Sequence, residues 1–260
     1  MSTTPTTPMT STGSRAAAPR RRVLAQAAFE VGSLLRNGEQ LLVSLVLPAM
    51  ALVGLSVTSS PSLGPGARID VATPGVIALC VISAAFTSQA ISTGFDRRYA
   101  VLRYLGVTPL GRSGLVAAKV LATLAVEAVQ IGVIAALGLV LGWRPEVSGI
   151  AYAVLFVIVG TWTFVALALL LAGTLRAEAV LAIANLVWVL LLGLGGVIVP
   201  RTELPAGVSH VVAFLPSAGL ADGLRSALVH GQLNLAALGV VLVWGLVATV
   251  LAARLFRFDD

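Results

Sequence analysis

The chain has 260 residues, of which 58% are hydrophobic and 11% are charged, and its mean hydropathy is +0.99. A water-soluble domain has about 25% charged residues, so this composition excludes a soluble globular protein and requires a lipid bilayer as solvent. The net charge of +6 comes from basic residues that alternate with apolar runs, so membrane topology explains it better than nucleic-acid binding does. The single cysteine, Cys80, lies inside an apolar run, which excludes an intrachain disulfide and a cysteine-based metal cluster.

The N-terminal region divides into a polar tail and a patterned segment. Residues 1–19 are rich in Thr, Ser and Pro and have no apolar stretch, so we expect a disordered tail and no secretory signal peptide. After them, Arg22, Gln26 and Glu30 recur on one helical face, opposite an apolar face, over Arg21–Asn37. This pattern predicts an amphipathic helix at the membrane surface, and an extension of the first span is the alternative.

Six apolar runs are each long enough to cross the hydrocarbon core of a bilayer, which is about 30 Å thick. They are Leu41–Ser59, Thr73–Thr93, Leu115–Leu141, Ile150–Leu175, Ala179–Val199 and Leu233–Ala253. Pro48 inside the first run predicts a kink, because proline removes a helical hydrogen bond. The sequence therefore predicts an all-α polytopic membrane protein in which residues 20–260 form a single transmembrane domain.

Arginine and lysine are distributed unevenly between the two sides that six spans define. The N-terminal region and the connection after the second span carry five each, the turn after the fourth span one and the C-terminal tail two. The opposite side has four, namely Arg68, Arg144, Arg201 and Arg225. By the positive-inside rule, thirteen against four predicts that both termini are cytoplasmic.

The connection between the second and third spans, Gly94–Lys119, is too patterned for a simple turn. Phe95 and Tyr99 have helical spacing, and Thr108–Pro109 ends the segment because a residue before proline disfavours the helical conformation. A positive-inside anchor with no further role is the alternative. The residues of this connection that could contact a partner are Asp96, Arg97, Arg98, Arg103, Thr108, Pro109 and Arg112.

The segment before the last span, Leu190–Leu228, is interrupted by a glycine cluster and three prolines. The prolines leave two half-helices, Ala206–Phe214 and Ser217–Val229, which are too short to span. Such pieces tolerate membrane depth only when protein covers them or water faces them. An external loop with a surface helix is the alternative. The residues that mark this segment are Gly196, Pro200, Pro205, Pro216 and Arg225.

In their order along the chain, these features resemble the permeases of the ABC-2 type exporter family. The resemblance covers nearly the whole chain and includes a basic pair, a Leu-Arg-x-Leu step and a Thr-Pro-Leu turn before Lys119. It implies that Gly94–Lys119 forms a coupling helix that contacts a separate ATPase subunit. It also implies that the broken segment forms external re-entrant helices, and that two permease copies, identical or related, form the pathway.

The chain carries no phosphate-binding loop of its own. A Walker A motif needs Gly-Lys-Ser/Thr, whereas the only lysine, Lys119, lies between Ala118 and Val120. Motifs for a serine nucleophile or a zinc protease are absent as well, and His210 and His230 have no carboxylate pattern around them. We therefore expect no catalytic, cofactor or metal site here, with ATP and Mg²⁺ bound by the partner subunit.

Glu127 is the one carboxylate well inside a span. A charge near the middle of a bilayer costs at least about 2.5 kcal/mol, so this residue should face protein or water. Gln130 lies on the same face, and we expect Asn185 in the fifth span to hydrogen-bond across helices. Glu127 is either a structural group, hydrogen-bonded or protonated, or part of a translocation path with Gln130 and Asn185.

Three functions remain open. A permease driven by an ATPase fits the resemblance, and an ion-coupled secondary carrier that uses Glu127 is the alternative. The third is a membrane enzyme or an assembly factor, although catalysis inside the membrane would need convergent polar groups that the spans do not offer. Weakly polar spans and a short external loop, Ser60–Ala72, favour a hydrophobic or amphipathic substrate such as a drug, antibiotic or lipid-like molecule. Arginine in place of lysine suggests a high-GC bacterium, and hence a plasma-membrane exporter.

Overall fold

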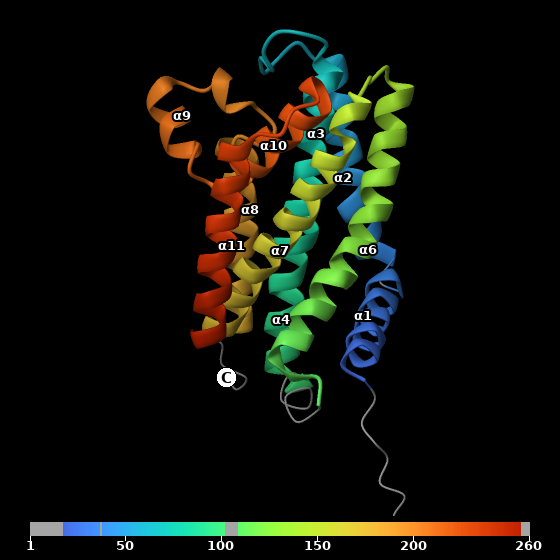
Figure 1. The fold of residues 1–260 in the computed structure, drawn as a ribbon, viewed down its shortest axis with the longest axis vertical. Helices are drawn as coiled ribbons and strands as arrows, with labels where there is room; N and C mark the ends of the chain where they lie inside the picture. Colours follow the sequence, from blue (N-terminus) through green and yellow to red (C-terminus); the bar gives the residue numbers. More distant parts are fainter. Residues whose placement is uncertain (1–17, 37, 102–108, 256–260) are drawn as a thin grey trace, which may run out of the picture.

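The computed structural model describes residues 18–36, 38–101 and 109–255, and within these ranges every regular element is helical. The long helices run side by side as one bundle (Figure 1). Their bounds are α1 Pro19–Arg36, α2 Gly38–Val57, α3 Arg68–Val81, the π-helix η1 Ile82–Ser88, α4 Gln89–Arg98, α6 Gly111–Val140, the 3₁₀ turn η2 Val147–Gly149, α7 Ile150–Thr174, α8 Ala177–Leu194, the 3₁₀ turn η3 Arg201–Glu203, α9 Ala206–Val212, α10 Pro216–His230 and α11 Leu235–Leu255.

Among the described residues, five helical runs are long and apolar enough to cross a membrane. They are Arg68–Arg98, Ser113–Val140, Val147–Thr174, Ala177–Leu194 and Leu235–Leu255, and they overlap the second to sixth predicted spans. The predicted first span coincides with α2, which continues through Pro48 as one helix. Within α2, the stretch Ser44–Val57 is apolar but shorter than the other five runs.

The run Arg68–Arg98 is the central helix of the bundle. It consists of α3, η1 and α4 without a break, and it packs against α6, α7, α8 and α10. Its middle, Ile82–Ser88, is a π-helix, a rare element that often accompanies functional positions in helices. This run therefore connects one end of the bundle to the other as a continuous helix with a π-helical middle.

The fifth predicted span ends earlier than expected. The prediction ran to Val199, whereas α8 ends at Leu194 because Gly195 caps it and Gly196 takes a left-handed conformation with φ of 71°. The chain then turns back through η3 into α9 and α10, which meet at an angle of 95°. Residues 195–230 are called the returning segment below. The two predicted half-helices are therefore present, and α10 packs into the bundle against α3, α7 and α11.

At Gly75 in α3 the returning segment approaches the central helix closely. A Cβ atom at this position would lie 2.5 Å from the carbonyl oxygen of Val197 and 2.8 Å from Nη2 of Arg225. Both neighbours are held by hydrogen bonds, so neither can move away cheaply. Close packing here therefore depends on the absence of a side chain.

We expect Gly75→Ala to lower the free energy of unfolding by about 1–3 kcal/mol, the usual cost of overpacking a core. The matched control is Gly132→Ala in α6, where an added Cβ would meet nothing within 4 Å. That control should be neutral or slightly stabilising, since alanine favours a helix. Thermal unfolding of both variants in detergent measures the difference, and equal midpoints would contradict the assignment.

Candidate functional site

A continuous polar face runs along α6. Lys119, Thr123, Glu127 and Gln130 follow each other at steps of four, four and three residues, which places them on one side of the helix. None of the four residues is more than 3% exposed. Buried polar groups cost free energy unless they have partners, so the neighbouring helices must supply them.

At one end of this face, Lys119 joins three helices. Its Nζ atom lies 3.4 Å from Oε2 of Glu30 in α1 and 3.6 Å from Oδ2 of Asp96 in α4. The lysine side chain is 2% exposed, whereas those of Glu30 and Asp96 are 13% and 33% exposed. One buried cation thus connects the predicted interface helix and the predicted coupling segment to α6.

Deeper in the bundle, the same face bonds to further helices. The Gln89 amide in α4 donates to the Thr123 hydroxyl over 3.0 Å. Gln130 donates from its amide nitrogen to the Ser44 hydroxyl in α2, also over 3.0 Å. The amide oxygens of Gln89 and Gln130 are buried and have no hydrogen-bond partner among the described residues. The polar face of α6 is therefore a contact surface for several helices, at successive depths.

Glu127 is completely buried and bonds to α7. The Thr161 hydroxyl lies 2.5 Å from its Oε2 atom and 2.7 Å from the carbonyl oxygen of Val157. Because a hydroxyl has a single proton, it can donate to only one of these two acceptors. A neutral Glu127 carboxyl that donates to Thr161 satisfies both contacts, so the geometry suits the structural role more directly than a charge.

We expect the free energy of unfolding of Glu127→Gln to lie within about 1 kcal/mol of that of the unchanged protein. The amide has the same size as the carboxyl and can also donate to Thr161. Glu127→Ala should cost about 2–3 kcal/mol, since it leaves a cavity and an unpaired hydroxyl. Transport by the Gln variant should be close to normal. A stable Gln variant that does not transport would instead place this carboxyl in the translocation mechanism.

The residues expected to contact a partner occupy different environments. Arg97 is 6% exposed, and it donates to the carbonyl oxygens of Ala172 (2.8 Å) and Leu175 (2.6 Å) at the end of α7. This burial does not match a role at a docking surface, because the guanidinium holds α4 against α7. The adjacent Arg98 is exposed and forms an ion pair with Glu178 at the start of α8.

The start of α6 lies beside α1. The exposed Pro109 accepts a hydrogen bond at its carbonyl oxygen from Arg22, and Gln26 donates to Glu30 over 3.2 Å. Arg103 and Thr108 lie outside the described residues, as does the side chain of Arg112. The described members of the predicted contact set, with α1, therefore gather at the lower end of the bundle in Figure 1.

Asn185 does not join the polar face of α6. Its amide donates to the carbonyl oxygen of Leu181, 2.9 Å away in its own helix, so the expected bond across helices is wrong within this chain. The residue is exposed near the middle of α8. Its neighbours on this outer face are large apolar residues, including Leu181, Leu186, Val189 and Leu190. A polar amide at the middle of a span is therefore left on the outside of a single copy.

At the opposite end, Arg225 holds the returning segment in place. Its guanidinium donates to the carbonyl oxygens of Gly196 (2.8 Å), Val197 and Ile198 (3.3 Å), and it lies 3.7 Å from the carboxylate of Asp222.

Three prolines open the short elements around Arg225. Pro200 precedes η3, Pro205 precedes α9 and Pro216 is the first residue of α10.

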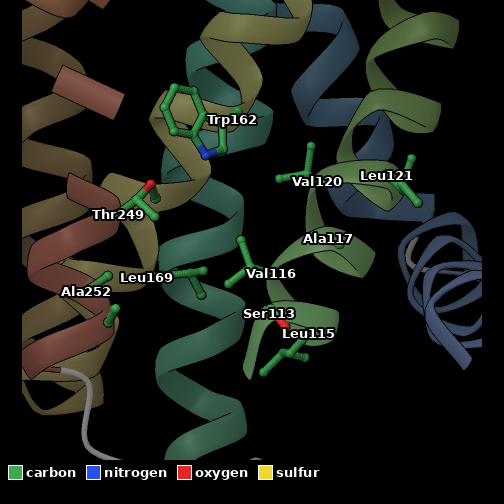
Figure 2. A pocket seen from close by; sticks show the side chains of 12 residues that line it. Ser113, Leu115, Val116, Ala117, Val120, Leu121, Trp162, Leu169, Thr249 and Ala252 are labelled. Carbon is green, nitrogen blue, oxygen red and sulfur yellow. The ribbon is translucent and has the colours of Figure 1, made fainter. Parts of the chain in front are cut away.

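A groove of about 690 Å³ opens between α6, α7 and α11, and its walls are almost entirely apolar (Figure 2). Trp162 lies at the upper end of the groove in this view, and Ser113 lies near the lower end. The residues that line it are Ser113, Leu115, Val116, Ala117, Val120, Leu121, Trp162, Ala166, Leu169, Thr249, Ala252 and Ala253. Such a groove suits a hydrophobic molecule rather than a polar substrate.

Comparison with known families agrees with this architecture. Residues 22–229 match the family model described as ABC-2 type transporter. The chain belongs to the ABC-2 type transporter family. No curated protein matches it significantly. An ABC-2 transporter domain is a transport domain, so the chain is the permease subunit of an ABC transporter, and this family normally works with an ABC ATPase partner. Within the described residues of this ABC-2 permease, no group of three His, Cys, Asp or Glu could hold a metal ion.

Some partners in the ABC-2 permease's polar core were not among the predicted site residues. These partners are Lys119, Thr123, Gln89 and Thr161. A signal was present in the sequence, because positions 119, 123 and 127 are one helical turn apart in a 30-residue helix. Their partners lie 34 to 89 residues away, and spacing alone cannot identify them.

Proposed function

We propose that this permease moves a hydrophobic or amphipathic substrate out of the cell, driven by a separate ATPase subunit that binds ATP and Mg²⁺. Two copies, identical or related, form the pathway in a bacterial plasma membrane, with both termini in the cytoplasm. The chain contributes no enzymatic site and has no nucleic-acid partner. This proposal combines the family's normal reliance on an ATPase with the arrangement of charged residues at one end of the bundle.

The observation that carries this proposal is the link formed by Lys119. Because its ammonium contacts Glu30 in α1 and Asp96 in α4, a push on either helix reaches the start of the membrane-crossing α6. From there the buried polar face passes the displacement to α7 and α2 through Thr161 and Ser44. An ATPase that closes on ATP could thus change the packing of the spans.

The docking surface we propose combines exposed groups at the same end with predicted contact residues of the connection. The exposed groups are Arg98 with its partner Glu178, and Pro109. Arg103, Thr108 and Arg112 are included from the sequence prediction alone. Arg97 is left out because it is buried beneath this surface. An ATPase surface that binds here should carry carboxylates, since the predicted contact residues are mainly arginines.

Copurification with the proposed ATPase subunit tests the docking surface. We expect Arg98→Glu combined with Arg103→Glu to abolish copurification in mild detergent, because like charges would then face each other. The matched control is Arg144→Glu, an exposed arginine at the opposite end. Normal copurification of the double variant would contradict the surface, and proton-driven transport by the permease alone would favour the ion-coupled alternative instead.

The exposed amide of Asn185 supports the pairing of two copies. Lipid offers it no hydrogen bond, whereas a second copy related by a twofold axis could place another Asn185 opposite, and each amide can both donate and accept. Cys80 is buried, so Asn185→Cys would supply the only accessible thiol among the described residues. We expect a thiol cross-linker to join two copies at this position and not at the exposed Val247→Cys in α11. Cross-linking through Val247→Cys but not through Asn185→Cys would place the contact between the two copies elsewhere.

A further inference from the structure

Four buried side-chain oxygens on α4 and α6 have no hydrogen-bond partner among the described residues. They are Oε1 of Gln89, Oγ1 of Thr93, Oε1 of Glu127 and Oε1 of Gln130. None of the four residues is more than 3% exposed. Buried polar atoms normally have a partner, because an acceptor that loses water without gaining a donor is costly. These atoms therefore indicate a ligand inside the bundle.

The four oxygens form two pairs by their positions on the helices. Gln89 and Thr93 are four residues apart in α4, and Glu127 and Gln130 are three residues apart in α6. Residues three or four apart on a helix are neighbours, with about 5–6 Å between their Cβ atoms. A molecule that bonds two oxygens at about 2.8 Å each bridges a gap of up to about 5.6 Å. Each pair can therefore share one small molecule.

The direct contacts of these side chains determine what such a molecule must supply. The amide nitrogens of both glutamines already donate, one to Thr123 and the other to Ser44. The second carboxyl oxygen of Glu127 is already bonded to Thr161. The pair in α6 thus offers two acceptors, and the pair in α4 offers an acceptor and the Thr93 hydroxyl, which can donate or accept. The ligand must donate two hydrogen bonds at once in α6 and at least one in α4.

This chemistry favours water over a metal ion. Within the described residues, no group of three His, Cys, Asp or Glu could hold a metal ion. The only carboxyl in either pair belongs to Glu127, and its contact with Thr161 suits a neutral group, which offers a cation no opposite charge. Water has two protons to donate, and internal water molecules typically make about three hydrogen bonds to buried polar groups.

We propose that two internal water molecules bind here, one between Gln89 and Thr93 and one between Glu127 and Gln130. The first donates to the Gln89 amide oxygen and bonds to the Thr93 hydroxyl, where α4 meets α6. The second donates one proton to each oxygen of its pair, where α6 meets α2 and α7. The polar face of α6 is thus joined to its neighbours partly through water, inside a domain that crosses the membrane.

A density map of the purified full-length permease, obtained by cryo-electron microscopy, tests both sites. The map must show ordered water on exposed backbone groups, because this demonstrates that a bound water would be visible. We expect one peak in each pair, about 2.6–3.0 Å from both oxygens. Both peaks should persist when choline replaces sodium in the buffer, since water binding here needs no cation.

Two substitutions serve as controls for each other. Gln89→Met and Gln130→Met each keep an unbranched side chain but remove the amide, so each should abolish its own peak and keep the other. A map that shows exposed water but neither peak would overturn the proposal. So would peaks that vanish without sodium, or a peak that survives the loss of its own glutamine.

The map of the unchanged protein is decisive even where a variant does not fold. A direct hydrogen bond from a rotated Gln130 amide to the Glu127 carboxyl would overturn the second site. The experiment needs neither the ATPase nor a substrate, so it can fail or succeed independently of the proposed function.

Discussion

Lys119→Met will uncouple ATP hydrolysis from transport and will also destabilise the permease. The substitution keeps an unbranched side chain of similar length but removes the ammonium that lies between Glu30 and Asp96. Two carboxylates would then face each other around a largely buried site without a cation. Removal of one partner from a buried ion pair costs about 3–5 kcal/mol, and we expect the lower end because Asp96 is one-third exposed.

A variant with all three charges removed separates stability from mechanical linkage. Glu30→Gln, Asp96→Asn and Lys119→Met together leave no unpaired charge, so most of the lost stability should return. The link between α1, α4 and α6 would nevertheless be weaker. We therefore expect the triple variant to unfold near the normal temperature and still to transport at least about tenfold more slowly than the unchanged protein.

Thermal unfolding measures the first effect, and transport per ATP hydrolysed in proteoliposomes with the ATPase measures the second. If the triple variant transports normally, the three charges serve stability alone and the proposed link is wrong. If Lys119→Met is as stable as the unchanged protein, the buried geometry of the ammonium is wrong. These two results are independent, because the first concerns motion and the second concerns burial.

The helices of this permease could be predicted because each depends on local pattern. Apolar runs of the length of a bilayer locate α6, α7 and α11 within a few residues, and prolines divide the returning segment where α9 and α10 divide. Hydropathy does not predict the end of α8, because the glycines at 195 and 196 lie inside an apolar run. Gly195 caps the helix and Gly196 takes a left-handed conformation, and together they end α8 although the residues around them are apolar.

The site was predictable only as a set of candidates. Spacing shows that Glu127 and Gln130 share a helical face, but the identity of their partners depends on which helices pack together. Arg97 illustrates the limit, since a basic pair looks alike in sequence while one member is buried against α7 and the other is exposed. Asn185 illustrates the converse, because a polar residue in a span need not face its own bundle.

Arg225→Ala will have the largest effect at the opposite end of the permease. The guanidinium serves the carbonyl oxygens of Gly196 and Val197, which follow α8, and it also faces Asp222. Alanine would leave these buried acceptors without donors and a carboxylate without one of its cations. We expect a loss of about 3–5 kcal/mol in the free energy of unfolding, as for other buried charged groups that lose a partner.

Two further substitutions show which property of the residue matters. Arg225→Lys keeps the charge, but an ammonium cannot reach several carbonyls in one plane as a guanidinium does, so about half of the loss should remain. Arg201 is the other arginine paired with Asp222, and the Arg201 side chain is 40% exposed. Arg201→Ala should therefore cost less than about 1 kcal/mol. Thermal unfolding of the three variants gives the order.

The expected order is Arg225→Ala, then Arg225→Lys, then Arg201→Ala, from the most to the least destabilised. Equal effects of the two alanine variants would mean that the ion pairs with Asp222, rather than the carbonyl contacts, hold the segment after α8 against α10. Because α10 fills the space between α3, α7 and α11, its release would open the bundle at this end. If motion begins at Lys119, the returning segment can respond to it by a partial loss of the contacts between α10 and its neighbours α3, α7 and α11.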